Sequence, residues 1–152
     1  MAERSDLPRR ARFGFFHGLR VRWSELDPQG IVFNPNYLVY FDIAVTEYLR
    51  KLDFVYPRDF SAAGSDMFAV HSSLNFCASA RYDDEIAVGV RAARLGRTSF
   101  AFELGIFRDE ELLVYGSLVY VNASAETRKP QSLPTPFVHK VLAFERLPPE
   151  RG

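Results

Sequence analysis

The chain has 152 residues, the size of one ordinary domain, and hydrophobic residues make up 47% of it. This composition excludes an intrinsically disordered or low-complexity protein, and it allows one hydrophobic core without disulfides or metals. Nineteen basic residues balance nineteen acidic ones, so no overall charge attracts nucleic acid or anionic lipid. We expect neither as a partner.

The first 12 residues are expected to form a flexible tail. They carry a basic cluster (Arg4, Arg9, Arg10 and Arg12), which could serve as a nucleic-acid arm but is typical of a solvated tail. No apolar stretch follows these charges, and no window approaches the roughly 18 apolar residues of a membrane helix. The single cysteine, Cys77, excludes an internal disulfide. Together these features predict a cytoplasmic protein.

The first half of the chain predicts a strand, a turn and a long helix. Residues 15–23 alternate loosely and indicate the strand, and Asp27 opens a turn-like cluster that ends at Gly30. Asn34 is a favoured N-cap, and Pro35 suits the first helical position. Residues 36–52 then have apolar side chains at helical spacing, in such number that other structure must largely wrap this helix.

The second half predicts four strands from its period-two alternation. Their ranges are 67–80, about 85–92, about 99–106, and 112–122. Short connections between such strands imply antiparallel neighbours. One long buried helix and several strands in a row predict an α+β domain, with an antiparallel sheet curled around the helix. We place this single domain at residues 13–146, with 147–152 as a C-terminal tail.

Few residues have the spacing of a known chemical site. The common nucleotide, hydrolase and metalloprotease motifs are absent, and the three histidines lack metal-ligand spacing, so we expect no metal. His71 and Cys77 fall in an apolar strand and are expected to be packed core residues.

Asp27 has two interpretations. Asp-Pro-x-Gly is typical of a type I turn. Alternatively, a carboxylate beside the start of a helix can activate a nucleophile, while N–H groups of Asn34 and of the first helical turn hold a developing oxyanion. Glu25 lies two residues before Asp27, so in an extended chain both carboxylates would face the same side.

The sequence from Asp27 to Tyr37, Asp-Pro-Gln-Gly-Ile-Val-Phe-Asn-Pro-Asn-Tyr, resembles the signature of the hotdog-fold acyl-CoA thioesterases of the 4-hydroxybenzoyl-CoA thioesterase family. Segments 82–84 and 95–100 resemble strand and turn sequences of that family, and the similarity extends from residue 15 to residue 122. It implies a hotdog fold that hydrolyses an aroyl- or short- to medium-chain acyl-CoA, such as 4-hydroxybenzoyl-CoA. No cofactor is implied beyond the coenzyme A of the substrate.

The resemblance also implies catalytic roles for two residues. Asp27 matches the family's catalytic aspartate, which acts as a nucleophile or as a general base toward water. Asn34 matches the position whose backbone N–H polarises the thioester carbonyl. Close members often have an aromatic residue there, but the role belongs to the backbone and survives this departure.

Three further residues are implied to bind the substrate. Tyr37 ends the signature, and Asp42 matches an acidic helix position that faces the acyl pocket across a dimer interface. Asp42 also fits a solvated polar row on the helix. Arg97 falls where the family often places a basic residue near the phosphates of coenzyme A, and it also fits a solvated turn.

Two alternatives belong to other functional classes. A non-catalytic acyl-CoA or acyl-carrier binding protein could use the same pocket, with Asp27 only a turn residue. A hotdog dehydratase would need a catalytic histidine paired with an acid, for which His71 is the only candidate in the strands. The resemblance further implies a homo-oligomer, either a dimer or a dimer of dimers, with its sites at the subunit interface.

Overall fold

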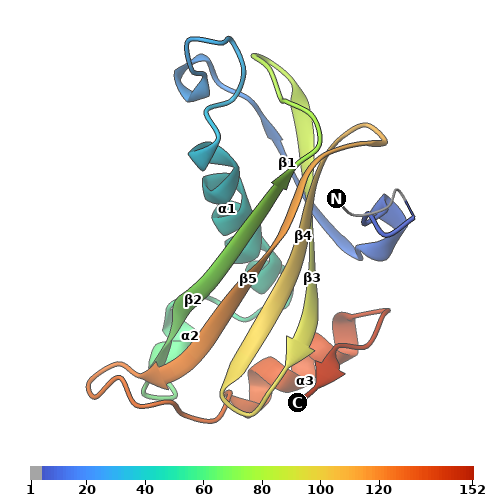
Figure 1. Ribbon diagram of the computed structural model, residues 1–152. Coiled ribbons are helices and arrows are strands. Elements are labelled where there is room, and N and C mark those ends of the chain that lie inside the picture. The colour runs from blue at the N-terminus through green and yellow to red at the C-terminus, as the bar shows by residue number, and fades with distance from the viewer. Residues whose placement is uncertain (1–4) are drawn as a thin grey trace.

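A computed structural model describes residues 5–152 (Figure 1). The strands are β1 (Phe15–Arg20), β2 (Ser65–Phe76), β3 (Glu85–Leu95), β4 (Ser99–Arg108), β5 (Glu111–Ser124) and β6 (Glu150–Arg151), and the helices are α1 (Pro35–Lys51), α2 (Arg58–Ser61) and α3 (Thr135–Phe144). Short 3₁₀ turns lie at Arg10–Arg12 and Trp23–Glu25. Residues 1–4 of the expected tail, including Arg4, lie outside the described residues.

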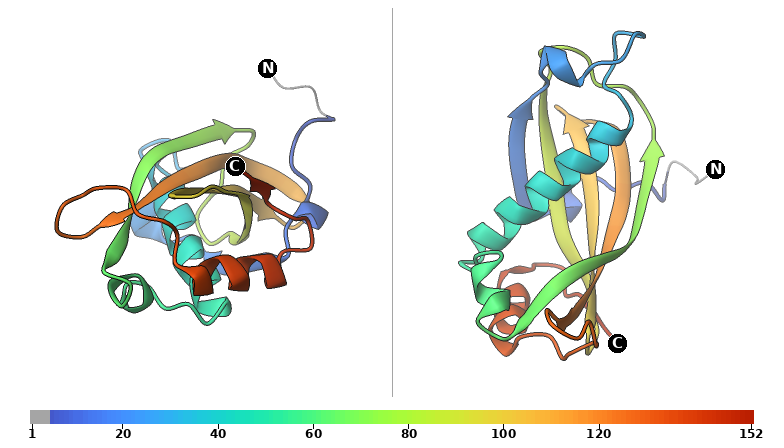
Figure 2. Two further views of the ribbon diagram at one scale, coloured as in Figure 1. Left: turned by 90° about the horizontal axis from the view of Figure 1, so that it is seen from below. Right: turned by 90° about the vertical axis from the view of Figure 1, so that its left-hand side faces the viewer.

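The strands form one sheet in the order β1-β3-β4-β5-β2, and all neighbours on this path are antiparallel. The short β6 adds a parallel pair at the end of β3. The sheet curves around α1, which lies against its concave face (Figure 2). The predicted α+β architecture, an antiparallel sheet around one long helix, is therefore confirmed.

The core lies between α1 and the inner face of the sheet. Alternate residues of β3 and β4 point inward and are fully or almost fully buried: Ile86, Val88, Val90, Ala92, Phe100, Phe102, Leu104 and Ile106. The buried face of α1 includes Phe41, Ala44, Val45 and Tyr48. The period-two and helical patterns of the sequence thus identified the two surfaces that meet in the core.

Details at the ends of several elements differ from those expected, and β1 ends at Arg20 rather than at residue 23. Asn34 is not a side-chain cap: its backbone is already helical (φ −54°, ψ −35°) and its side chain makes no capping hydrogen bond. The carbonyl of Phe33 instead accepts the Asn36 N–H at 2.8 Å, so the first turn is closed by the backbone. β2 ends at Phe76 rather than at residue 80, because the chain then turns toward the start of α1, where Val32 N donates to Ala80 O at 2.9 Å.

Structure beyond β5 was not expected. Helix α3 buries Phe137 and Val141, and the Phe137 ring packs against Phe54 and Phe100 with centroids 5.4 and 4.9 Å away. The expected C-terminal tail contains β6. Within the expected N-terminal tail, the Arg10 guanidinium lies 4.5 Å from the ring centroid of Phe16 on the outer face of the sheet.

The prediction that His71 and Cys77 are packed core residues is wrong, because both are exposed. His71 lies on β2, and Cys77 directly follows it. β2 is the last strand on the path and pairs only with β5. An apolar sequence in an edge strand therefore does not imply burial, because no further strand of the same chain covers that edge. Separately, no helix within residues 5–152 is long and apolar enough to cross a membrane.

Candidate active site

Asp27 forms the predicted turn, at the tip of the loop between β1 and α1. Its carbonyl accepts the Gly30 N–H at 3.0 Å, and its Oδ1 accepts the Gln29 N–H at 2.8 Å. Gly30 has φ +74°, a conformation that favours glycine. Among the described residues no group donates to Oδ2, which leaves this oxygen available for chemistry.

The start of α1 supplies one available donor rather than several. The N–H groups of Asn36 and Tyr37 donate to Phe33 O and Asn34 O at 2.8 and 3.3 Å, and Pro35 has no N–H. Within residues 5–152 no acceptor meets the backbone N–H of Asn34. The expectation that N–H groups inside the first turn of the helix are also available is wrong, because these groups donate to backbone carbonyls three residues earlier.

Asp27 and Asn34 line the same cavity, of about 320 Å³. Its remaining walls come from the loop after Asp27, from Tyr37 on α1, and from residues 76–79 at the end of β2. The Tyr37 hydroxyl accepts the Ala80 N–H at 3.0 Å, and burial raises its pKa, with the Asp27 charge adding to the increase. Asp27, with its free carboxylate oxygen, and Asn34, with its free N–H, thus line one pocket large enough for a small reacting group.

A second cavity, of about 500 Å³, holds Asp42. It lies between the first turns of α1 and the middle of β2, and its walls include Leu38, Val39, His71 and Tyr120. Burial raises the pKa of Tyr120, and the charge of Asp42 raises it further. Helix α1 therefore contributes to both cavities. Within one chain, however, Asp42 lines a cavity that is separate from the Asp27 cavity and more apolar.

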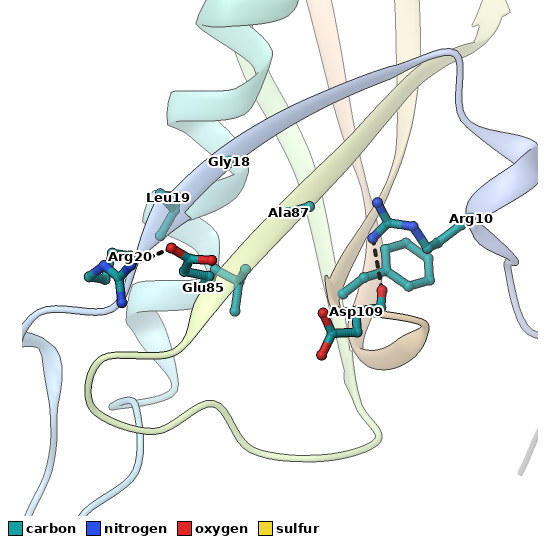
Figure 3. Close-up of a pocket in the computed structure, with 9 residues that line it drawn as sticks. Arg10, Gly18, Leu19, Arg20, Glu85, Ala87 and Asp109 are labelled. Atoms are coloured by element: carbon teal, nitrogen blue, oxygen red, sulfur yellow. Dashed lines mark hydrogen bonds and ion pairs between the residues drawn. The ribbon is translucent and has the colours of Figure 1, made fainter.

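A third cavity, of about 450 Å³, lies on the outer face of β1 and β3 (Figure 3). Three of its charged side chains are already engaged: Arg20 pairs with Glu85, and Arg10 donates to the Asp109 carbonyl at 2.9 Å (Figure 3). This cavity includes no residue from the Asp27 loop or α1, so we assign it no part in the chemistry.

Arg97 lies at the other end of the molecule from Asp27. The Asp27 loop follows β1, the β3–β4 turn with Arg97 follows β3, and these two strands are antiparallel neighbours. The start of α1 and the β3–β4 turn therefore lie at opposite ends of the sheet (Figure 1). β3 alone has 11 residues, or about 35 Å of extended chain. One chain does not bring Arg97 to Asp27.

Sequence reasoning missed how Glu25 is used. The Glu25 carboxylate does not line the Asp27 cavity. It lies at the end of the 3₁₀ turn Trp23–Glu25 and accepts hydrogen bonds from Tyr40 and Arg22. An extended chain would have placed both carboxylates on one side. No group of three or more His, Cys, Asp and Glu side chains in residues 5–152 is arranged to hold a metal ion.

Comparison with known proteins identifies the family of the chain. The family model of the thioesterase superfamily matches residues 29–115, more than half of the chain. The acyl-CoA thioesterase YbgC of Haemophilus influenzae is 25% identical over 121 residues, which are 80% of this chain and 89% of that protein. A putative esterase of Aquifex aeolicus is 30% identical over 96 residues, covering 63% of this chain and 74% of its own.

Solved structures of other proteins share the fold. The crystal structure of the PA5185 protein of Pseudomonas aeruginosa superposes with a TM-score of 0.81 at 26% identity, over 91% of this chain and 96% of that one. The family match and the topology agree with the resemblance found in the sequence. The chain belongs to the thioesterase superfamily and is a thioester hydrolase with the hotdog fold.

Proposed function

We propose that the protein is an acyl-CoA thioesterase in which Asp27 and the Asn34 N–H carry out the hydrolysis. The observation that supports this most directly is the 320 Å³ cavity, which both groups line. The similarity to the Haemophilus influenzae acyl-CoA thioesterase favours coenzyme A as the thiol. No cofactor is required beyond the coenzyme A of the substrate.

The reaction needs a nucleophile and a site for the oxyanion. Asp27 Oδ2 either attacks the thioester carbonyl itself or removes a proton from a water that attacks it. The Asn34 N–H donates to the carbonyl oxygen as its negative charge develops, the C–S bond breaks, and the thiolate leaves. In the first route an anhydride forms, and water then hydrolyses it. A positioned base contributes about 10²–10⁴ in rate, and one oxyanion donor roughly 10²–10³.

The larger cavity suits the acyl group, which would reach it across the dimer interface, because the two cavities of one chain are separate. Its apolar walls, Leu38 and Val39, would surround the hydrocarbon, while Asp42 would accept a hydrogen bond from a hydroxyl group on the acyl part. A hydroxylated aroyl-CoA, such as 4-hydroxybenzoyl-CoA, is therefore the substrate we propose within the wider class of aroyl- and short- to medium-chain acyl-CoA. Tyr37 would form the wall beside the reacting carbonyl.

A dimer would complete this site. β2 is an open edge, and pairing it antiparallel with a second copy would remove its unpaired backbone groups. The twofold axis would also reverse the partner's sheet, so the partner subunit's Arg97 would lie at the same end as Asp27. There it could contact the phosphates of coenzyme A.

The test is turnover of a thioester panel with detection of the released thiol. Benzoyl-, 4-hydroxybenzoyl-, butyryl- and octanoyl-CoA cover the proposed classes, and an acyl-carrier-protein thioester tests the carrier. We expect hydrolysis of at least one aroyl-CoA with little hydrolysis of the carrier substrate. Binding of acyl-CoA without thiol release would contradict the proposal and would support the binding-protein alternative.

A further inference from the structure

Glu25 is a buried charge that follows three exposed residues in the loop between β1 and α1. Its exposed fraction is 9%, whereas Arg22, Trp23 and Ser24 before it are all exposed. Its Oε2 accepts the Tyr40 hydroxyl at 2.5 Å and the Arg22 N–H at 2.9 Å, and its Oε1 accepts Arg22 Nε at 2.8 Å. Burying a carboxylate lowers the stability of the fold unless such donors satisfy it, so these hydrogen bonds are needed where they are.

The backbone of Glu25 holds the other side of the loop. Its carbonyl accepts the Phe33 N–H and the Asn36 side-chain amide, each at 2.9 Å. One residue therefore joins the start of the loop at Arg22, its end at Phe33, and the first two turns of α1 at Asn36 and Tyr40.

We call this set of Glu25 hydrogen bonds the bracket, and Asp27 lies in the part of the loop that it encloses. Leu26 pairs with Val32 as an isolated bridge, and the Asp27 N–H donates to Ile31 O at 2.9 Å. The turn that carries the reactive carboxylate is thus the tip of a small hairpin whose base is the Glu25–Phe33 hydrogen bond. A shift at the base moves the tip relative to Asn34, the first residue after Phe33.

We infer that Glu25 is a positioning residue: held by Tyr40, it fixes the distance between the Asp27 carboxylate and the Asn34 N–H. The inference rests on the proposed function. A misplacement of about 1 Å at a reacting group can cost roughly 10²-fold in rate. The cost of a loosened bracket should therefore appear in kcat, since Glu25 does not line the substrate cavity.

The protonation states agree with this role. Burial by itself raises the pKa of Glu25, but the hydrogen bonds from Tyr40 and Arg22 outweigh it and hold this pKa below its ordinary value. Burial and the neighbouring carboxylate raise the pKa of Tyr40 far above its ordinary value. At neutral pH a charged Glu25 thus accepts from a protonated Tyr40, a charge-assisted bond of the stronger kind.

The chain offers a matched control on the same helix. Tyr48 is also buried, and its hydroxyl also donates to a carboxylate, that of Glu145, at 2.6 Å. This second pair lies two turns further along α1, away from Asp27. Tyr40→Phe and Tyr48→Phe each remove one hydroxyl from a buried tyrosine–carboxylate pair, but only the first releases the bracket. Glu25→Gln tests the same bracket from the other side.

The experiment measures kcat, KM and amide hydrogen exchange of residues 22–36 in the wild type and the three variants. We expect Tyr40→Phe and Glu25→Gln to lower kcat by about 10- to 10²-fold with little change in KM, and to speed exchange in the loop. Tyr48→Phe should lower the melting temperature while leaving both kcat and loop exchange near wild type.

Two outcomes would overturn the inference. Loop exchange in Tyr40→Phe equal to that of wild type would show that Glu25 does not hold the loop, whatever the protein hydrolyses. Faster exchange with unchanged kcat would show that the bracket does not position Asp27. A wild type that hydrolyses no thioester would instead contradict the proposed function, and the exchange data would then still decide whether the bracket exists.

Discussion

The two carboxylate oxygens of Asp27 have different surroundings, and this difference separates its roles. Oδ1 accepts the Gln29 N–H and supports the turn, whereas within residues 5–152 no group donates to Oδ2. Asp27→Asn keeps an oxygen for the turn but removes the charge. We expect the melting temperature and acyl-CoA binding to survive and kcat to fall by about 10² or more, because an amide is a poor base and a poor nucleophile.

Asp27→Ala is the control for this prediction, because deamidation of the new asparagine would restore aspartate and leave residual activity. Near-wild-type kcat in both variants would remove Asp27 from the chemistry and would leave it a turn residue only.

Asp42 should affect substrate selection rather than chemistry. It lines the larger cavity and not the one that holds Asp27. If its carboxylate accepts a hydrogen bond from a substrate hydroxyl, Asp42→Ala should reduce kcat/KM for 4-hydroxybenzoyl-CoA about tenfold more than for benzoyl-CoA, as losing a hydrogen bond to a charged group implies. Equal losses on the two substrates would show that Asp42 has no such contact.

Glu145 should make stability depend on pH. Burial raises its pKa above the ordinary 4.5, and hydrogen bonds from Tyr48 and the Ala92 N–H only partly offset this. The folded protein therefore binds this proton more tightly than the unfolded chain does. The resulting stability is complete below pH 4.5 and is lost as the pH rises through the raised pKa.

Glu145→Gln keeps an Oε1 that can accept both hydrogen bonds, which reach Glu145 Oε1 at 2.6 and 2.7 Å. The variant should match wild type in melting temperature at about pH 4. It should exceed wild type at pH 7–8, because glutamine has no carboxylate charge to bury at this position. Thermal melts across this range check the sign. A wild type that is the more stable protein at pH 8 would contradict it.

At the scale of elements, β2 and β5 approach so closely that one position must be glycine. A Cβ on Gly116 would lie 1.8 Å from the Ser73 carbonyl oxygen and 3.2 Å from the ring of Phe41. Because the first neighbour is backbone, the strands would have to separate. Gly116→Ala should destabilise the protein by about 1–3 kcal/mol or more.

Gly18→Ala is the matched control, since it also lies in a strand and a Cβ there meets nothing within 4 Å. Chemical denaturation of both variants gives the comparison. Equal free energies of unfolding for the two would show that the β2–β5 spacing is not as tight as described.

At the scale of the whole molecule, the edge strand β2 carries exposed apolar side chains, and this predicts self-association. Val70 interrupts the β2–β5 register and is 59% exposed, and Phe76 at the end of β2 is 57% exposed. We expect at least a homodimer at micromolar concentration by sedimentation equilibrium, because open apolar edges favour pairing. A monomeric mass would contradict this.

Val70→Lys should weaken the dimer, since a lysine on an edge strand opposes pairing. Leu142→Lys, at an exposed apolar position on α3 that is 42% exposed, should leave the mass unchanged. Loss of thioesterase activity in step with the dimer would support a site completed by the partner.

The sequence by itself determined the long helix, the five main strands and the turn at Asp27. Helical spacing in α1, alternation in β3 and β4, and the Asp-Pro-x-Gly turn all depend on residues within a few positions of one another, so they could be read locally. The match of the thioesterase family over residues 29–115 then confirmed the family that the motif had indicated, while the catalytic role of Asp27 stays a prediction. Helix α3 was not predicted from the sequence, because its burial depends on Phe54 and Phe100, which are distant along the chain.

Only the tertiary structure decided which groups meet. His71 and Cys77 are exposed because β2 ends the sheet, a fact of strand order that no local pattern contains. The structure separates Asp42 and Arg97 from Asp27, and it turns Glu25 toward Tyr40 on α1. Periodicity assigns a side chain to a face, but the neighbours of that face are set by long-range packing between segments distant in the sequence.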